Sequence, residues 1–376
     1  MRVLLIANYL PDGQISMRKF SQMLFEGLST KGLQVDLIRP KSILCYSKKS
    51  YTGIGKWLGY IDKFLLFPLF LNRKIHGADI IHICDHSQSI YLTQMKKKPS
   101  ILTCHDLLAV RSALGEFAAH QTKRLGRIFQ KKILSSINHA RHVVCDSQAT
   151  LNDVKRLTKI QDKDLSIVYP GLNYEYLAMG QEEAKAILRE HHIHVPESFF
   201  IHVGKGTWYK NLKGLGEIFR RLIGMPSTSE HHLVLVGEAF NNLKISEPSM
   251  EKEIKERVHC FFRIENKILN ALYSLAEALI YPSHAEGLGW PVLEAQASGC
   301  PVFASNRAPM TEVGGDAAVF FNPDDAEEAS EMIAKNISNR DKMIQKGFQN
   351  CKRFSSENMI QQYLEVYYRL LNENVH

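Results

Sequence analysis

The 376-residue chain is predicted to be an α/β protein of two domains, each built around a doubly wound parallel sheet. Three observations predict this class. The length exceeds what one hydrophobic core usually serves. Hydrophobic residues make up 45% and charged residues 23%, the balance of a folded globular protein. Short apolar runs alternate with helical stretches, and this alternation restarts midway along the chain.

The first series of apolar runs belongs to an N-terminal domain that we expect over residues 1–175. The runs are continuous rather than alternating, which is typical of parallel strands covered on both faces. They are Val3–Ala7, Val35–Ile38, Ile80–Ile83, Ile101–Cys104, Val143–Cys145 and Ile167–Tyr169. This domain is therefore predicted to be Rossmann-like.

The second series follows a polar, helix-prone stretch and predicts another Rossmann-like domain over residues 176–355. Its runs are Phe199–Val203, Leu233–Val236, Val258–Phe262, Ala278–Tyr281, Val302–Ala304 and Val319–Phe321. Residues 356–376 have apolar residues at helical spacing and should form a terminal helix that packs back toward the N-terminal domain. Open sheets bind ligands beyond the carboxyl ends of their strands, so two facing domains predict an active-site cleft between them.

Charge and cysteine content limit the partners and the compartment. The net charge is +8, but residues 1–172 hold 26 Lys and Arg against 12 Asp and Glu, a net +14. This half should meet an anion: nucleic acid, an acidic membrane surface or a phosphorylated acceptor. The seven cysteines form no CxxC pair, and no apolar stretch is long enough to span a membrane. We expect a cytoplasmic protein, with a peripheral position on the inner face of the membrane as an option.

The strongest motif follows the run that ends at Tyr281. Its glycine-containing loop precedes Pro291, a residue that suits the first turn of a helix. Such a loop and helix N-terminus can bind a diphosphate; the residues are Gly287, Leu288 and Gly289. Glu286 and Glu294 flank this loop and can accept hydrogen bonds from sugar and ribose hydroxyls. Alternatively, Glu294 only complements the helix dipole and Glu286 lies on a surface loop.

This run resembles the Glu-x7-Glu signature, with its Glu-Gly-x-Gly-x-Pro core, of the retaining group 1 or family 4 glycosyltransferases. The resemblance extends through residues 272–283, 301–305, 312–317 and 322–323, which is nearly all of the second domain. It implies the glycosyltransferase B fold. It also implies that Glu286 contacts the donor sugar, that Gly287 to Gly289 offer amides to the phosphates, and that Glu294 holds the ribose.

A second motif, after the run that ends at Val203, combines Gly204, Lys205, Lys210 and Asn211. A lysine here can neutralise charge on a leaving diphosphate and replace a metal. Asn211 is a plausible helix N-cap. Lys210 matches the lysine of the family's Arg-Lys-Asn segment, whereas Tyr209 stands where the family has arginine. Lys205 is the candidate for the second charge, and the alternative for both lysines is that they are solvated surface residues.

In the first domain, His105 and Asp106 resemble the family's Thr-x-His-Asp segment. The resemblance implies that His105 faces the reacting centre from the acceptor side, and Asp106 could orient its ring. A histidine that follows a strand is more often structural, and this alternative stays open. The loop after the first strand contributes Gly13 and Gln14, which should border the donor phosphates or the acceptor.

The N-terminal domain also contains a basic, aromatic-rich stretch over residues 41–74 and a second basic group over residues 111–132. Cationic amphipathic helices can lie on an anionic membrane. Equally, the aromatic residues could be core and the lysines a solvated face. No nucleic-acid-binding motif is present, so we expect no nucleic acid. Asp162 and Asp164 form a literal DxD before a strand, which we interpret as chance, and no metal site is expected.

Together these patterns predict a retaining, metal-independent glycosyltransferase without a cofactor. It would move a hexose from a GDP- or UDP-linked donor to a saccharide or lipid-linked saccharide. A nicotinamide-dependent oxidoreductase would need G-x-G-x-x-G after a strand, and the G-x-G segments here lack the third glycine. The other alternative is a non-catalytic nucleotide-sugar or saccharide binding protein, which the Tyr209 departure supports.

Overall fold

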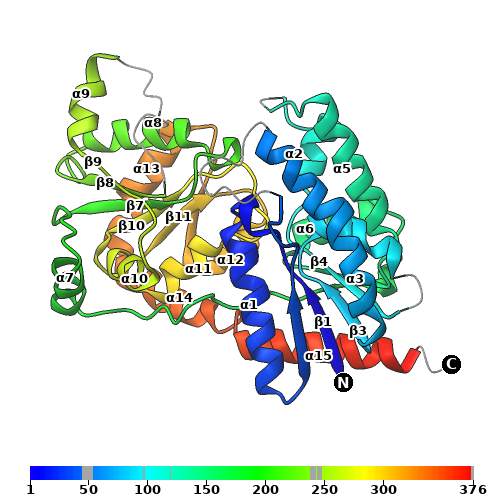
Figure 1. Ribbon diagram of the computed structural model, residues 1–376. Coiled ribbons are helices and arrows are strands. Elements are labelled where there is room, and N and C mark those ends of the chain that lie inside the picture. Colours follow the sequence, from blue (N-terminus) through cyan, green and yellow to red (C-terminus); the bar gives the residue numbers. More distant parts are fainter. Residues whose placement is uncertain (45–53, 96–97, 119, 238–242, 244–247, 374–376) are drawn as a thin grey trace. The chain divides into compact units, whose positions relative to one another are not determined.

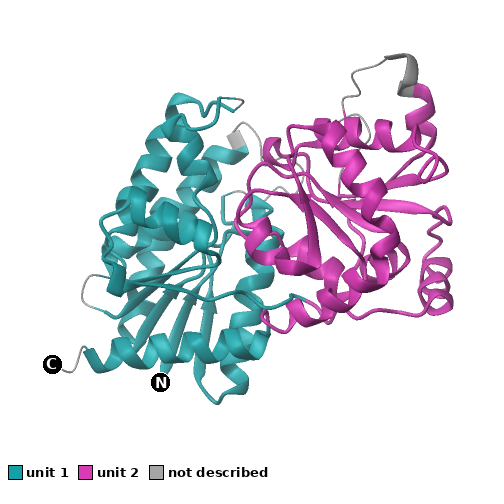
Figure 2. Ribbon diagram, turned by 180° about the vertical axis from the view of Figure 1, so that it is seen from behind, with its two compact units in different colours: residues 1–173, 355–376 teal, residues 174–354 magenta. Residues whose placement is uncertain are grey.

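The computed structural model describes residues 1–44, 54–95, 98–118, 120–237, 243 and 248–373. The chain divides into two compact units, which Figure 2 colours separately. Unit 1 comprises Met1–Asn173 with Ser355–His376, and unit 2 comprises Tyr174–Phe354. Each unit contains one six-stranded parallel sheet (Figure 1). Within the described residues, the helices are all too short or too polar to cross a membrane.

The sheet of unit 1 has the strand order β2-β1-β3-β4-β5-β6. Its strands are β1 (Arg2–Ile6), β2 (Gln34–Ile38), β3 (Ile80–Ile83), β4 (Ser100–Cys104), β5 (His142–Cys145) and β6 (Leu165–Ile167). The predicted last strand extended to Tyr169, which is wrong: β6 ends at Ile167, shortly before Pro170, which has no N–H to give to a ladder. The carboxyl ends of β1, β3, β4 and β5 lie side by side at one edge.

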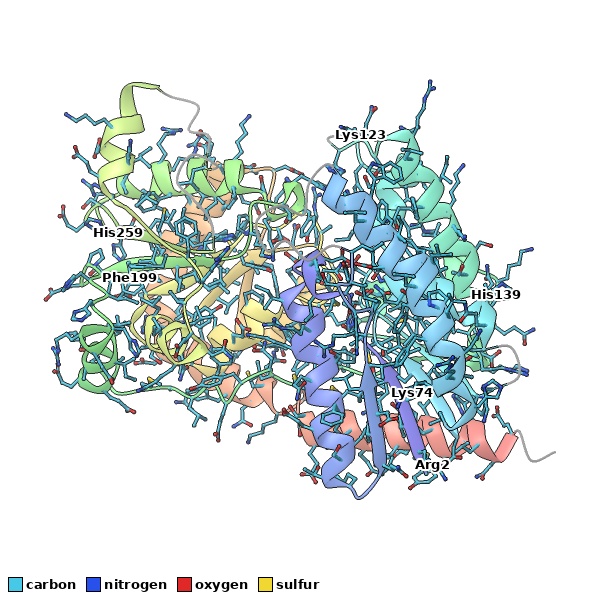
Figure 3. The ribbon with its side chains drawn as sticks, in the orientation of Figure 1. Arg2, Lys74, Lys123, His139, Phe199 and His259 are labelled. Carbon is cyan, nitrogen blue, oxygen red and sulfur yellow. The ribbon has the colours of Figure 1, made fainter. Side chains whose placement is uncertain are left out.

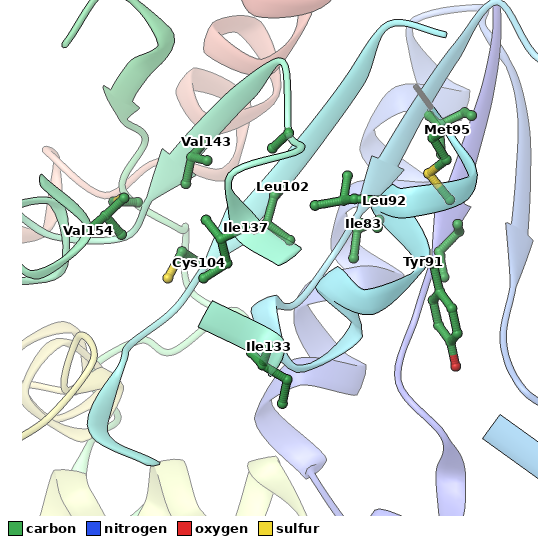
Figure 4. Packing of buried hydrophobic residues seen from close by; sticks show 14 of the residues in the cluster. Ile83, Tyr91, Leu92, Met95, Leu102, Cys104, Ile133, Ile137, Val143 and Val154 are labelled. Carbon is green, nitrogen blue, oxygen red and sulfur yellow. The ribbon is translucent and has the colours of Figure 1, made fainter. Parts of the chain in front are cut away.

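One face of this sheet forms a continuous apolar core. Figure 4 shows Ile83, Leu102 and Val143 of the sheet packed against Leu92 and Ile137 of the covering helices. Burying such side chains contributes about 1.5–3 kcal/mol each, which is why these strands are apolar along their whole length. The longer helical segments between β2 and β6 are α2 (Ile54–Ile61), η2 (Asp62–Leu66), α3 (Phe67–His76), η3 (His86–Gln94), α4 (Leu108–Leu114), α5 (Arg124–Ile137) and α6 (Gln148–Leu157).

The other face is covered by α1 (Ile15–Thr30) and by α15 (Ser356–Glu373), the last helix of the chain. Buried polar groups join α15 to the sheet: His82 Nδ1 lies 2.6 Å from the Tyr367 hydroxyl, and its Nε2 lies 2.7 Å from Thr103 Oγ1. A Cβ atom at Gly27 of α1 would lie 2.4 Å from Ile360 Cγ1. Only glycine therefore lets α1 and α15 approach this closely.

Unit 2 has the strand order β12-β11-β10-β7-β8-β9. Its strands are β7 (Phe199–Val203), β8 (His232–Val236), β9 (Val258–Phe261), β10 (Ala278–Tyr281), β11 (Val302–Ser305) and β12 (Ala318–Phe321). Its helices are α7 (Gln181–Glu190), α8 (Leu212–Ile223), α9 (Pro248–Glu256), α10 (Asn266–Leu275), α11 (Trp290–Ala297), α12 (Met310–Gly314), α13 (Ala326–Asn336) and α14 (Arg340–Cys351). Two parallel sheets with helices confirm the predicted α/β class. The cleft stays a prediction.

Candidate active site

The centre of the site in unit 2 is a contact between Lys210 and Glu286. Lys210 ends the short helix η5 (Trp208–Lys210), and Glu286 lies in the loop after β10. Lys210 Nζ lies 2.8 Å from Glu286 Oε1, and the two side chains are only 12% and 9% exposed. The structure thus brings together two residues that the sequence placed 76 positions apart. The alternative that Glu286 is a surface loop residue is wrong.

Tyr281, the last residue of β10, completes this cluster. Its hydroxyl donates to Glu286 Oε1 at 2.9 Å and accepts from Lys210 Nζ. Lys210 Nζ also lies 4.6 Å from the centre of the tyrosine ring, within cation–π range. Burial, followed by the negative charge of Glu286, raises the pKa of Tyr281 well above its usual value. The phenol therefore stays neutral and keeps its proton for donation.

Gly204 and His202 lie next to the side chain of Lys210. A Cβ atom at Gly204 would lie 3.2 Å from Lys210 Cδ and Cε, so glycine makes room for the lysine side chain. His202 Nδ1 donates to the Ile280 carbonyl at 2.9 Å, and burial lowers the pKa of His202 to about 4. Its Nε2 is a buried acceptor that has no hydrogen-bond partner among the described residues. A polar acceptor therefore lies beside Lys210.

Asn211 confirms its predicted position as an N-cap. It adopts φ +53°, and its Oδ1 accepts from the Gly214 amide at 3.1 Å to begin α8. Its Nδ2 donates to the Pro323 carbonyl at 2.8 Å, so the same side chain ties α8 to the loop after β12. Lys205 is exposed in the loop before η5. The donor-binding roles of both residues stay predictions.

The glycine loop leads directly into α11. Gly289 is the N-cap with φ +98°, a conformation that favours glycine, and Pro291 follows in the first turn. Leu288 is buried, and Gly287 directly follows Glu286. The loop meets the N-terminus of α11, which carries the positive end of the helix dipole. This arrangement can hold one anion next to Lys210 and Glu286.

Glu294 lies within α11 itself. It is the fifth residue of the helix, beyond the first turn, and only 6% exposed. Its Oε2 accepts from the Tyr273 hydroxyl at 3.2 Å. A buried, hydrogen-bonded carboxylate in the second turn does not fit the alternative that Glu294 merely complements the helix dipole, because that effect fades after the first turn.

In unit 1, His105 follows β4 and is held by two internal hydrogen bonds. Its Nδ1 lies 2.5 Å from Asp146 Oδ2, and its Nε2 lies 2.8 Å from the Cys84 carbonyl. Burial alone would lower the pKa of His105, but Asp146 outweighs it and the net shift raises the pKa to about 9. Both ring nitrogens then carry protons. The interpretation that Asp106 orients this ring is wrong: Asp106 Oδ1 instead accepts from the Leu108 amide at 2.9 Å.

The loop after β1 joins the same edge through Asn8. Asn8 Nδ2 donates both to Gln14 Oε1 and to Asp85 Oδ2. Gly13, at φ +67°, precedes Gln14. Although burial opposes it, the neighbouring His86 and His105 lower the pKa of Asp85 below its usual value. The edge therefore places the buried carboxylate of Asp85, which Asn8 holds by a hydrogen bond, near His105.

Across the residues that the structure describes, no three His, Cys, Asp or Glu side chains are grouped to hold a metal ion. Asp162 of the DxD lies in η4 (Asp162–Asp164), with its Oδ2 atom 2.9 Å from Lys155 Nζ.

Sequence reasoning missed Tyr281, His202, Asp85 and Asp146. A signal was available for the two acids. Three neighbouring strands each lead into a cysteine and then a titratable residue: Cys84-Asp85, Cys104-His105 and Cys145-Asp146. Because parallel strands bring their carboxyl ends to one edge, this repeat predicts that the three titratable side chains meet.

Comparison with known proteins agrees with this geometry. Residues 183–352 match the family described as Glycosyl transferases group 1, and residues 20–176 match Glycosyltransferase Family 4. O-antigen chain mannosyltransferase B of Escherichia coli is 23% identical over 286 residues, which cover 75% of this chain and 73% of that protein.

Two solved structures show the same fold. Sucrose-phosphate synthase from Thermosynechococcus elongatus superposes with a TM-score of 0.77 at 19% identity, covering 99% of this chain and 100% of that one. HepE from Anabaena, in complex with UDP-glucose, gives a TM-score of 0.68 at 15% identity and covers 97% of this chain and 98% of that one. The chain therefore belongs to the group 1, family 4 glycosyltransferases and is a transferase with their two-domain B fold.

Proposed function

We propose that this protein moves a hexose from a nucleotide diphosphate sugar to a saccharide or lipid-linked saccharide, with retention of configuration and without a metal. The observation that carries the proposal is the largely buried Lys210–Glu286 ion pair beside the glycine loop and the start of α11. The pair supplies one cation and one carboxylate, and the loop of Gly287 to Gly289 adds backbone amides next to Glu286. A sugar diphosphate needs each of these groups.

The diphosphate lies against the amides of Gly287 to Gly289, and Lys210 neutralises the charge that develops as it leaves. Glu286 accepts hydrogen bonds from the sugar hydroxyls, and the buried carboxylate of Glu294 accepts them from the ribose. The bond from the anomeric carbon to the phosphate oxygen breaks while the bond to the acceptor oxygen forms. The acceptor proton passes to the departing phosphate. In this scheme Glu286, whose Oε1 contacts Lys210 and Tyr281, binds the sugar and is not the nucleophile.

His105 acts as a positioning residue on the acceptor side. Both of its ring nitrogens are engaged, so it holds the strand ends together rather than touching substrate through the ring. Gln14 and Asp106 border the acceptor. The donor is GDP- or UDP-linked. A mannosyltransferase relative and a structural neighbour that binds UDP-glucose support a hexose, and the O-antigen relative supports polysaccharide assembly.

The test is a thermal-shift panel of UDP, GDP, ADP and dTDP with their sugar conjugates, run in EDTA. We expect one nucleotide series to raise Tm without metal and Glu294→Ala to remove the shift. Glu331→Ala, an exposed glutamate of α13 in the same unit, is the matched control. A shift that requires Mg²⁺ would contradict the metal-independent proposal.

A second assay follows sugar transfer and the anomeric configuration of the product by NMR. Donor binding without transfer to any acceptor would favour a non-catalytic binding protein. Tyr209, which stands at the family's arginine position, would then be the first residue to examine.

A further inference from the structure

Unit 1 exposes a row of large apolar side chains along α2, η2 and α3. Trp57, Ile61, Leu65 and Leu69 recur at every fourth position and are 56%, 38%, 60% and 67% exposed. Residues four apart lie on one side of a helix, so these four form a single stripe. Scattered exposed apolar residues are ordinary, but a continuous stripe marks an interaction surface.

The neighbouring helix α5 extends this stripe. Tyr60 and Phe64 pack on Phe129 of α5 with ring centroids 5.0 and 5.5 Å apart, and the helices lie side by side in Figures 1 and 2. On α5, Leu125 and Ile128 are 57% and 63% exposed. The aromatic-rich stretch therefore has two sides: Tyr60 and Phe64 pack inward, and the stripe faces outward.

Cations flank the stripe, and exposed acids are absent from these segments as described. Over residues 54–76 the only acid is Asp62, which is 1% exposed, and residues 123–141 contain none. Figure 3 labels Lys123 and Lys74 toward the two ends of this surface. We call it the basic apolar face: the six apolar residues above with the exposed cations Lys56, Arg73, Lys123, Arg124, Arg127, Lys131 and Lys132.

We propose that the basic apolar face rests on the anionic surface of a lipid membrane. The apolar stripe enters the headgroup region, and the flanking cations meet lipid phosphates. A second copy of this chain is the weaker occupant, because a symmetric contact would bring the cations of the two copies together. Nucleic acid would use the charges but would leave six large apolar side chains in water. The proposal is independent of the proposed reaction, since docking needs no donor.

Flotation of the full-length protein with vesicles tests this. We expect binding to phosphatidylcholine vesicles that contain phosphatidylglycerol, weak binding to phosphatidylcholine alone, and release as salt is raised. Leu65→Ser with Leu69→Ser removes the centre of the stripe, and Arg124→Gln with Lys131→Gln and Lys132→Gln removes part of the charge. Each variant should lower the partition coefficient roughly tenfold or more.

Matched controls come from unit 2. Leu177→Ser changes a leucine that is 58% exposed, and Lys335→Gln with Lys342→Gln and Lys352→Gln removes three exposed lysines. Neither should alter binding. Trp57 should shift its emission to the blue on anionic vesicles. Trp57→Phe should lose most of that shift while still binding, which places the membrane at this face.

Three results would overturn the proposal: no binding of the native protein to anionic vesicles, binding that both face variants retain, or binding that only the charge variant loses. A dimer in sedimentation experiments that the Leu65→Ser and Leu69→Ser variant abolishes would assign the face to a second copy instead. Transfer to a short, water-soluble acceptor should be unchanged in both face variants. If the native protein did not transfer sugar to this acceptor, the result would count against the proposed function alone.

Discussion

The carboxyl edges of the two sheets share one topology and differ in chemistry. In unit 1, Asp85, His105 and Asp146 follow β3, β4 and β5; all three side chains are buried, and His105 pairs with Asp146. In unit 2, glycines follow β7 and β8, and the Lys210–Glu286 pair lies after β7 and β10, where the loop after β10 leads into α11. The comparison teaches that one topology provides the edge in both units, whereas the side chains set its chemistry: unit 1 buries two acids and a histidine, and unit 2 places a lysine–glutamate pair beside a helix N-terminus.

Two buried histidines sharpen this comparison. His105 next to Asp146 has its pKa raised to about 9, whereas burial, reinforced by Lys210, lowers the pKa of His202 to about 4. At neutral pH one ring is a cation with two donors, and the other is neutral with a spare acceptor. Burial favours the neutral form of both rings; the Asp146 carboxylate reverses this effect for His105, whereas Lys210 adds to it for His202.

Lys210→Ala should have the largest effect on activity, because it removes the cation that offsets the leaving diphosphate. We expect kcat to fall by about 10²–10³. Lys213→Ala, an exposed lysine of α8, is the control and should be near normal. If kcat in steady-state assays fell only a few fold, catalysis would not depend on the charge of Lys210.

The ion pair of unit 1 predicts a pH-dependent stability. The folded-state pKa of His105, about 9, lies above its ordinary value of 6.5. Its contribution is therefore fully present below pH 6.5 and is lost as the pH rises through 9. The loss should be on the order of 2–3 kcal/mol in the free energy of unfolding, measured with urea at several pH values. Asp146→Asn should flatten this decline. An unchanged dependence of stability on pH would show that His105 and Asp146 do not form an ion pair.

Tyr281→Phe removes one hydroxyl and leaves Lys210 and Glu286 paired. We expect roughly a tenfold loss of kcat with little change in KM, and about 1 kcal/mol of lost stability. Tyr368→Phe, at a 53% exposed position, serves as the control for losing a phenol. Full activity in Tyr281→Phe would show that the hydroxyl does not contribute to the site.

The Asn211 variants are expected to change stability and to have the smallest effect on activity. Asn211→Ala loses the N-cap of α8 and places alanine at φ +53°, which should cost about 1–2 kcal/mol. Asn211→Gly tolerates that φ and should cost less. Urea unfolding of both variants separates the contribution of the cap to stability from that of the backbone conformation. Equal costs would mean that the backbone conformation contributes nothing here.

The amino-acid sequence by itself determined the two sheets and most of the site in unit 2. Continuous apolar runs predict parallel strands because both faces are buried, and the spacing from Glu286 to Glu294 needs only a loop and one helix. The N-cap role of Asn211 was equally readable, since capping depends on a few neighbouring residues. These features depend on local contacts, and local contacts leave a pattern in sequence.

Only the tertiary structure decided the partners. His105 meets Asp146 across 41 positions and Lys210 meets Tyr281 across 71, so each contact depends on strand order rather than on spacing. Asp106 was the nearer acid to His105 in sequence, but it caps the start of α4. Likewise, the sequence alone does not tell which aromatic residues of this stretch are covered: Tyr60 packs against Phe129, whereas Trp57 is exposed. Which face of an amphipathic helix is covered depends on what the rest of the chain places beside it.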